Sequence, residues 1–250
     1  MTEPLYLTRV RISPETGAGR VIRALKKPGR MGDELALAHH LVWALFPGLP
    51  DCKERPFLYR DDGDGRYIVL SRGVEPKNEE GLFEMDGPKE FAPSLTAGDR
   101  LRFRLRANPV ARRRDERLRI NGDGTPRLDK KGRPQRVSKK DDVVMQELKS
   151  IPDDKRRAER ADIIQQAGRA WLQHIAKDAG FSVDPSSVLI DHYRQHRHWR
   201  KRGQDCQRFS TLDFEGVLEV SGPSQFLDKL AMGFGSAKAF GCGLMLIRRA

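Results

Sequence analysis

Apolar and polar residues alternate most regularly between Arg100 and Ala107. Leu101, Phe103 and Leu105 fall on one face of an extended segment, and arginines fill the positions between them. A period of two is typical of a half-buried β-strand. Shorter patterns predict further strands at 5–12, at 188–190, at 208–220 and at 243–248, and a hairpin formed by 57–60 and 67–70 around an acidic turn.

Helical periodicity is clearest in residues 33–46. Asp33 can cap the first turn, Pro47 ends the pattern, and Ala38, Leu41 and Leu45 fall on one apolar stripe. The same spacing predicts helices at 159–178 and 224–232.

The order of these elements indicates the fold class. The second half of the chain reads strand, helix, strand, strand, helix, strand, which is the split β-α-β arrangement of a ferredoxin-like domain. The first half also begins with a strand, a helix and a hairpin, although its second helix is weakly marked. We therefore predict an α+β fold of two tandem ferredoxin-like (RRM-like) domains, at 1–95 and 96–250.

Charge narrows the class of partner. The 250 residues carry a formal net charge of +12, which favours a polyanion, either nucleic acid or an acidic membrane face. No apolar run approaches the ~20 residues that span a bilayer, and the N-terminus lacks a secretory pattern. We expect a cytoplasmic protein with no membrane partner. Cys52, Cys206 and Cys242 are widely spaced and include no Cys-x-x-Cys pair, so neither a disulfide framework nor a zinc knuckle is indicated. We predict no metal site and no cofactor.

Two basic segments are candidates for a polyanion-binding surface. Arg102, Arg104 and Arg106 follow Arg100 on the polar face of the 100–107 strand, where their mutual repulsion would be relieved by an anion. Residues 111–140 contain twelve Lys/Arg against four Asp/Glu and almost no apolar side chains. This composition predicts a flexible loop that either orders on RNA or DNA or serves only as a solubilising insertion.

A third basic segment follows the strand at 188–190. His192, His196 and His198 alternate there with arginines, which would repel a metal cation, so anion contact is the better interpretation. With Tyr193 and Trp199, this hairpin could enter the mouth of an RNA groove or stack on an unpaired base. The candidate RNA-binding side chains here are Arg194, Arg197, Arg200, Lys201, Arg202 and Arg208.

A glycine-rich loop precedes the last strand. Gly233, Gly235, Gly241 and Gly243 surround Lys238 between a short helix and an apolar run. Glycines at positive φ could turn several N–H groups toward a phosphate beside the lysine. The other interpretation is a tight turn that lets the last strand pack closely, and the loop alone leaves both open.

His39 is the candidate catalytic side chain. It falls on the border of the apolar stripe of the 33–46 helix, whereas His40 faces solvent. At a border position, packing can fix the ring while one nitrogen stays reachable. An ordinary half-buried histidine would show the same pattern.

Several motifs together resemble the CasE family, the repeat-processing endoribonucleases of type I-E CRISPR systems. They are His39-x-x-x-Trp-x-Leu-Phe-Pro47, Leu101-Arg-Phe-Arg-Leu-Arg-Ala-Asn-Pro109, Phe214-Glu-Gly-Val-Leu218 and Gly235-Ser-Ala-Lys-Ala-Phe-Gly-Cys-Gly-Leu244. The resemblance runs from end to end apart from insertions at 14–31 and 111–140. It implies metal-independent cleavage at the 3′ base of the repeat hairpin, a 2′,3′-cyclic phosphate product, and retention of that crRNA with the other subunits of a surveillance complex.

The resemblance also implies site residues. The active-site histidine of the family falls on His39, its loop lysine on Lys238, and its groove-entering hairpin on residues 194–208. Some relatives have a tyrosine one turn before the histidine, where this chain has Ala36. Whether His39 acts as base or acid stays open. The alternative is a non-catalytic RNA-binding subunit of a ribonucleoprotein complex, in which His39 is only packed.

Overall fold

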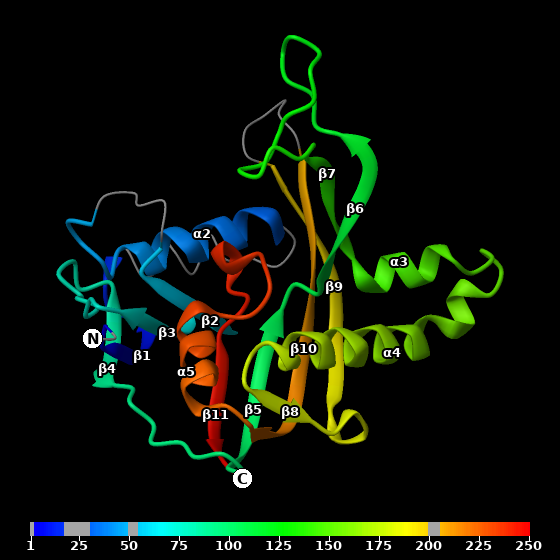
Figure 1. The fold of residues 1–250 in the computed structure, drawn as a ribbon. Helices are drawn as coiled ribbons and strands as arrows, with labels where there is room; N and C mark the ends of the chain where they lie inside the picture. Colours follow the sequence, from blue (N-terminus) through cyan, green and yellow to red (C-terminus); the bar gives the residue numbers. More distant parts are fainter. Residues whose placement is uncertain (1–2, 18–30, 50–54, 200–205) are drawn as a thin grey trace.

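The computed structural model describes residues 3–17, 31–49, 55–199 and 206–250. The basic insertion expected at 14–31 and Cys52 therefore lie mostly or wholly outside the described residues. Within the described part, the chain folds around two antiparallel sheets that stand side by side (Figure 1). No described helix is long and apolar enough to cross a membrane.

The N-terminal sheet contains β1 (Leu5–Ile12), β2 (Phe57–Gly63), β3 (Arg66–Arg72) and β4 (Phe83–Glu90) in the order β2-β3-β1-β4. Helix α2 (Met31–Trp43) connects β1 to β2. Alternation on β1 works as predicted, because Val10 and Ile12 are buried and Arg9 and Arg11 are exposed. Residues 73–82, between β3 and β4, contain no helix, so the weakly marked second helix of this half is absent.

The C-terminal sheet has the same plan. It contains β5 (Arg100–Ala107), β8 (Phe181–Val183), β10 (Cys206–Val220) and β11 (Met245–Arg249) in the order β11-β5-β10-β8, and β9 (Leu189–Trp199) pairs with the other half of β10. Helices α3 (Val143–Lys149), α4 (Arg156–Lys177) and α5 (Pro223–Met232) and the 3-10 turns η1 (Pro185–Ser187) and η2 (Lys238–Phe240) complete it. In both sheets the first strand lies between the third and the last, which confirms the predicted ferredoxin-like arrangement. The boundary between residues 95 and 96 stays a prediction.

Three apolar clusters hold these layers together. Phe103, Trp171 and Phe214 belong to the core of the C-terminal sheet, and Leu41 and Tyr59 to that of the N-terminal sheet. A third cluster joins the sheets: Leu58 of β2 and Leu70 of β3 pack with Leu244, which immediately precedes β11. Burial of apolar area is the main favourable term in folding, so this contact fixes the glycine-rich loop against the N-terminal sheet.

Residues 111–140 form a hairpin, so the prediction of a flexible loop was wrong. β6 (Val110–Leu118) pairs antiparallel with β7 (Arg136–Asp142) as a separate two-stranded sheet that projects from the body of the molecule (Figure 1). Asp142 then caps α3 by accepting hydrogen bonds from the amides of Val144 and Met145. This helix, which the sequence analysis did not predict, anchors the arm because Val144 and Leu148 are buried.

The tip of this hairpin consists of two successive turns of eight residues, 119–126 and 127–134. In each turn the third residue donates its amide to the carbonyl of the seventh, from Asn121 to Thr125 and from Asp129 to Arg133. In each, the sixth residue is a glycine at positive φ. The chain therefore repeats one turn geometry twice before it returns along β7.

Candidate nucleic-acid interface and active site

His39 is fixed by its neighbours on α2. Ala38 and Val42 are buried against the N-terminal sheet, His39 is half-buried and His40 is exposed. The indole Nε1–H of Trp43, one turn later, donates to His39 Nε2 over 3.2 Å. Because an indole nitrogen can only donate, Nε2 is an acceptor in this state, and the neutral imidazole carries its proton on Nδ1.

Helix α2 lies where the two sheets meet. It contacts both η2, which begins at Lys238, and strand β9 of the basic hairpin. The hydroxyl of Tyr59, on β2, donates to the carbonyl of Ala239 over 2.9 Å and so attaches η2 to the N-terminal sheet. The histidine helix, the glycine-rich loop and the basic hairpin therefore converge on one region.

The glycine-rich loop owes most of its glycines to packing. Gly233, Gly235, Gly241 and Gly243 all have positive φ. A Cβ on Gly233 would lie 2.8 Å from Leu58, and one on Gly243 would lie 2.7 Å from the carbonyl oxygen of Phe234. The amides of Gly233 and Gly243 donate to the carbonyls of Lys229 and Arg106, which corrects the expectation that these two N–H groups face a phosphate.

Lys238 is the only Lys or Arg within this loop, but cations from other segments surround it. Its Nζ donates to the carbonyl of Met232 at the end of α5. Burial, reinforced by the charges of Lys229, Arg55 and Lys140, holds the pKa of Lys238 below its usual value. Because like charges gathered in one place favour the binding of an anion, this environment supports the predicted phosphate contact.

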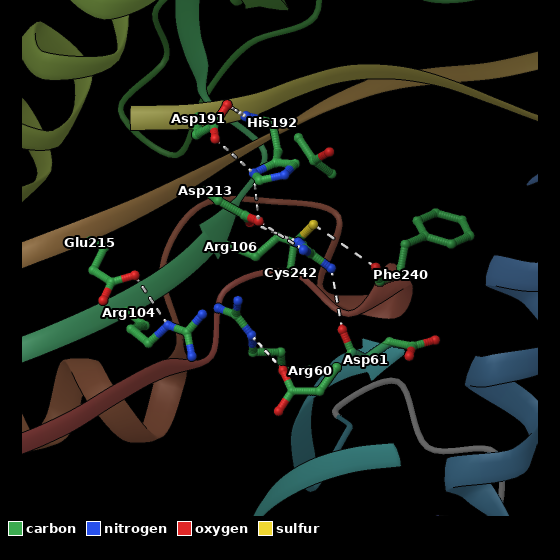
Figure 2. Close-up of polar contacts among 12 residues, drawn as sticks. Arg60, Asp61, Arg104, Arg106, Asp191, His192, Asp213, Glu215, Phe240 and Cys242 are labelled. Carbon is green, nitrogen blue, oxygen red and sulfur yellow. Dashed lines mark hydrogen bonds and ion pairs between the residues drawn. The ribbon is translucent and has the colours of Figure 1, made fainter. Parts of the chain in front are cut away.

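The arginines of β5 differ from one another in ways that the single strand did not reveal (Figure 2). Arg106 forms two hydrogen bonds with Asp213 of β10, at 2.7 and 2.8 Å, and a third with the carbonyl of Asp61, at 3.2 Å. Arg104 is 61% exposed and lies 3.4 Å from Glu215. These ion pairs correct the interpretation of the row as unneutralised charge. Arg102 is exposed and lies opposite Arg248 of β11.

Arg106 joins the two sheets, since Asp61 belongs to β2 and Asp213 to β10. Burial alone would raise the pKa of Asp213, but the hydrogen bonds and charge of Arg106 outweigh it and lower that pKa. The same hydrogen bonds raise the pKa of Arg106. The pair is therefore ionised, and its first role is to hold the sheets together.

Replacing Arg106 by glutamine is expected to lower the free energy of unfolding by about 1–3 kcal/mol, because Asp213 would keep its charge at a site that is 21% exposed. Urea denaturation measures the change. Arg104→Gln is the matched control on the same strand, and an exposed pair of this kind contributes about 0–1 kcal/mol. Equal losses in the two variants would contradict a joining role for Arg106.

After the arginines of β5, the hairpin of β9 and β10 carries a second group of basic side chains. Arg194, Arg197 and Arg208 are exposed, and Arg197 lies directly opposite Arg208. Arg200, Lys201 and Arg202 lie outside the described residues. Like charges opposite each other on a ribbon destabilise it unless an anion lies between them, so this arrangement supports the predicted contact with a polyanion.

An aromatic stack, which the sequence analysis missed, ties this hairpin to η2. The rings of His196 and Phe209 stack with centroids 4.9 Å apart, and those of Phe209 and Phe240 with centroids 4.7 Å apart. His198 packs on Phe240 at 5.2 Å. Burial and the charges of Arg194 and Arg106 lower the pKa of His196, which favours the neutral ring in the stack.

The hairpin of β6 and β7 repeats the pattern of facing cations. Arg112 lies opposite Lys140, and Arg113 lies opposite Lys139. All four side chains are exposed. Because Lys140 also acts on Lys238 electrostatically, this arm continues the positive region from η2 outward. Facing cations destabilise a ribbon unless an anion lies between them, so this arm also favours a polyanionic partner.

Comparison with known proteins decides the family. A family model described as "CRISPR associated protein" matches residues 5–249. The chain belongs to this family. Among its relatives, the Cascade subunit CasE of Escherichia coli is 27% identical over 217 residues, which cover 85% of this chain and 90% of that protein. The CRISPR-associated endoribonuclease Cse3 of Thermus thermophilus is 27% identical over 266 residues, covering 97% and 99%.

Solved structures agree with the sequence matches. CRISPR endoribonuclease Cse3 bound to a 19-nucleotide RNA has a TM-score of 0.60 and 25% identity, with coverage of 98% of this chain and 99% of that one. The Cas6e protein of Escherichia coli, at 23% identity and a TM-score of 0.52, shares the fold. Together these matches confirm the resemblance to the CasE family.

Proposed function

We propose that this protein is an endoribonuclease that cuts CRISPR repeat RNA at the 3′ base of its hairpin. In this proposal the 2′-hydroxyl attacks the adjacent phosphate without a metal, and the product ends in a 2′,3′-cyclic phosphate. The protein then keeps the crRNA as a subunit of a type I-E surveillance complex. The observation that carries the proposal is that α2, with His39, packs against both η2 and the basic hairpin. The endoribonuclease and Cascade names of the relatives support it.

RNA supplies its own nucleophile, so the protein must orient the linkage, move protons and stabilise the charge of the phosphorane. His39 moves a proton, as base or acid, and Lys238 faces the developing negative charge. In the free state Trp43 occupies Nε2 of His39. For that nitrogen to accept the proton of a 2′-hydroxyl, the hydroxyl must take the place of the indole N–H.

The two ribbons supply the binding energy for the stem. Phosphate contacts by Lys and Arg dominate affinity for nucleic acids and weaken as salt increases. The side chains in question are exposed Arg194, Arg197 and Arg208 on one ribbon and Arg112 and Lys139 on the other. In this proposal the stem lies along both ribbons, with its 3′ base beside η2.

A non-catalytic RNA-binding subunit is the second candidate. It is favoured by the limited access to both ring nitrogens of His39: Nε2 accepts a hydrogen bond from Trp43, and Nδ1 is buried. In that case His39 would serve only to pack α2. Tight binding of a repeat hairpin without scission of the strand would establish this alternative.

Cleavage is expected to continue at an undiminished rate in excess EDTA, because attack by the 2′-hydroxyl requires no metal-bound water. The product should carry a 2′,3′-cyclic phosphate, which phosphatase treatment leaves intact until acid opens the ring. Gel analysis of a hairpin from a CRISPR repeat of the same genome tests both points. A linear 3′-phosphate formed from the start, or loss of cleavage that added Mg²⁺ restores, would contradict the mechanism.

A further inference from the structure

A pocket of about 340 Å³ lies between the N-terminal sheet and the end of α5. Arg55 and Phe57 line it from the start of β2, Arg72 from the end of β3, Met232 from α5 and Lys238 from η2. Pockets for small ligands span roughly 300–1,000 Å³. The space therefore suits a single nucleotide.

The polar lining of this pocket is cationic. It contains Arg55, Arg72 and Lys238, and none of the described residues that line it is an Asp or Glu. Arg72 reaches Glu3, outside the lining, at 3.2 Å, and both side chains are more than a third exposed. The Nε atom of Arg55 is buried without a hydrogen-bond partner among the described residues. A buried donor that lacks a partner favours an acceptor from a ligand.

One wall of the pocket is apolar. Met232, at the end of α5, is 58% exposed and is one of the few large apolar side chains that are exposed in the described part of the chain. A thioether packs well against an aromatic ring such as a nucleobase. Three cations beside an apolar wall match a phosphate with its attached nucleoside.

The position of η2 indicates which nucleotide this would be. Lys238, at the start of η2, lines the pocket, whereas Phe240, at its end, stacks on Phe209 of the basic hairpin. η2 therefore separates the pocket from the ribbons that would hold the stem. An RNA strand that leaves the stem and passes η2 would reach the pocket with its next nucleotide.

We propose that this pocket binds the first nucleotide on the 3′ side of the scissile linkage. Arg55 and Arg72 hold the phosphate on its 3′ side, Lys238 faces the scissile phosphate on its 5′ side, and its base packs against Met232. The inference rests on the proposed function, because it takes the place of the scissile linkage from that function. It adds a contact with the leaving strand, and this contact is lost when that strand departs after cleavage.

The test measures dissociation constants for two repeat hairpins with a 2′-deoxy residue at the cleavage position. One RNA ends at the linkage, and the other continues by three nucleotides. We expect the longer RNA to bind the wild type more tightly. Arg72→Gln, which removes a cation, and Ala231→Trp, which fills the pocket, should each weaken only the longer RNA, about tenfold, as for one lost charge-assisted hydrogen bond.

Two matched variants control for charge and bulk. Arg66→Gln removes a cation from the other end of β3 that is also paired with a carboxylate, that of Asp64. Ser224→Trp adds the same ring at the other, exposed end of α5. Neither residue lines the pocket, so both controls should bind the two RNAs as the wild type does.

Equal weakening of both RNAs by the pocket variants, or no weakening, would overturn the inference. An RNA extended at its 5′ end completes the set, and selective weakening of that RNA would overturn the assigned polarity. Scission is not needed for these measurements. If wild-type protein fails to cut repeat RNA while the 3′ effect persists, the proposed function fails alone; if it cuts and the effect is absent, only the pocket assignment fails.

Discussion

His39→Ala is expected to slow cleavage of a repeat hairpin by about 10²–10⁴-fold, the usual contribution of a general acid or base. Affinity for the RNA should change little, because the cations that bind phosphate are untouched. Single-turnover cleavage and a separate binding titration give the two quantities. A split between rate and affinity distinguishes proton transfer from simple packing.

The neighbouring residue provides the control for this substitution. His40 lies on the same helix and is exposed, so His40→Ala removes an equal imidazole from solvent. It should leave both rate and affinity unchanged. If His39→Ala cuts as fast as the wild type, or if the two alanine variants behave alike, His39 has no catalytic role and the non-catalytic alternative gains.

Gly243→Ala is expected to produce the largest loss of stability among the variants considered. Its φ of +95° is unfavourable for a residue with a side chain, and the new Cβ would lie 2.7 Å from the Phe234 carbonyl oxygen. Left-handed backbone costs about 1–2 kcal/mol for an L-residue, and a forced contact in a packed region adds about 1–3 kcal/mol. Urea denaturation measures the sum.

Gly98→Ala separates these two contributions. Gly98 has a similar φ of +89°, but a Cβ there would meet nothing within 4 Å. This variant should lose only the backbone part. Equal losses at the two positions would show that the crowding at Gly243 is relieved by small shifts, and a reduced salt dependence of RNA binding in Gly243→Ala would restore a phosphate-binding role for this part of the loop.

Local periodicity predicts an element correctly where it reflects burial of one face. The alternation at Leu101, Phe103 and Leu105 identified β5 because one face of that strand is core. The stripe on α2 placed His39 at its border for the same reason, and the structure has it half-buried. In both elements, the side-chain pattern of a single segment is sufficient to predict which face is buried.

Contacts between distant segments could not be predicted in this way. The partner of Arg106 is Asp213, 107 residues further along the chain, and only the register of β5 on β10 brings them together. The stack of Phe209 on Phe240 likewise needs the packing of η2 against the hairpin. Low hydrophobicity concealed β6 and β7, because this ribbon buries little and its turns, rather than its core, define it.

One further signal was present in residues 119–134. Arg119-Ile-Asn-Gly-Asp-Gly-Thr-Pro126 is followed by Arg127-Leu-Asp-Lys-Lys-Gly-Arg-Pro134, so position 1 is arginine, position 6 glycine and position 8 proline in both. Asp123 and Asp129 accept backbone amides within their turns. Two of the four Asp/Glu side chains in residues 111–140 therefore stabilise the turns of the backbone.

Three backbone hydrogen bonds join the two octapeptides and the following Gln135 in a closed ring. Arg119 donates its amide to Gln135, Gln135 to Arg127, and Arg127 to Arg119. Arg127 occupies the same place in the second unit as Arg119 in the first, so it could close directly on Gln135 if the first unit were deleted. The reach of this cationic arm can therefore shorten or lengthen in whole modules, by duplication or loss of a short coding segment, while its attachment to the rest of the protein stays the same.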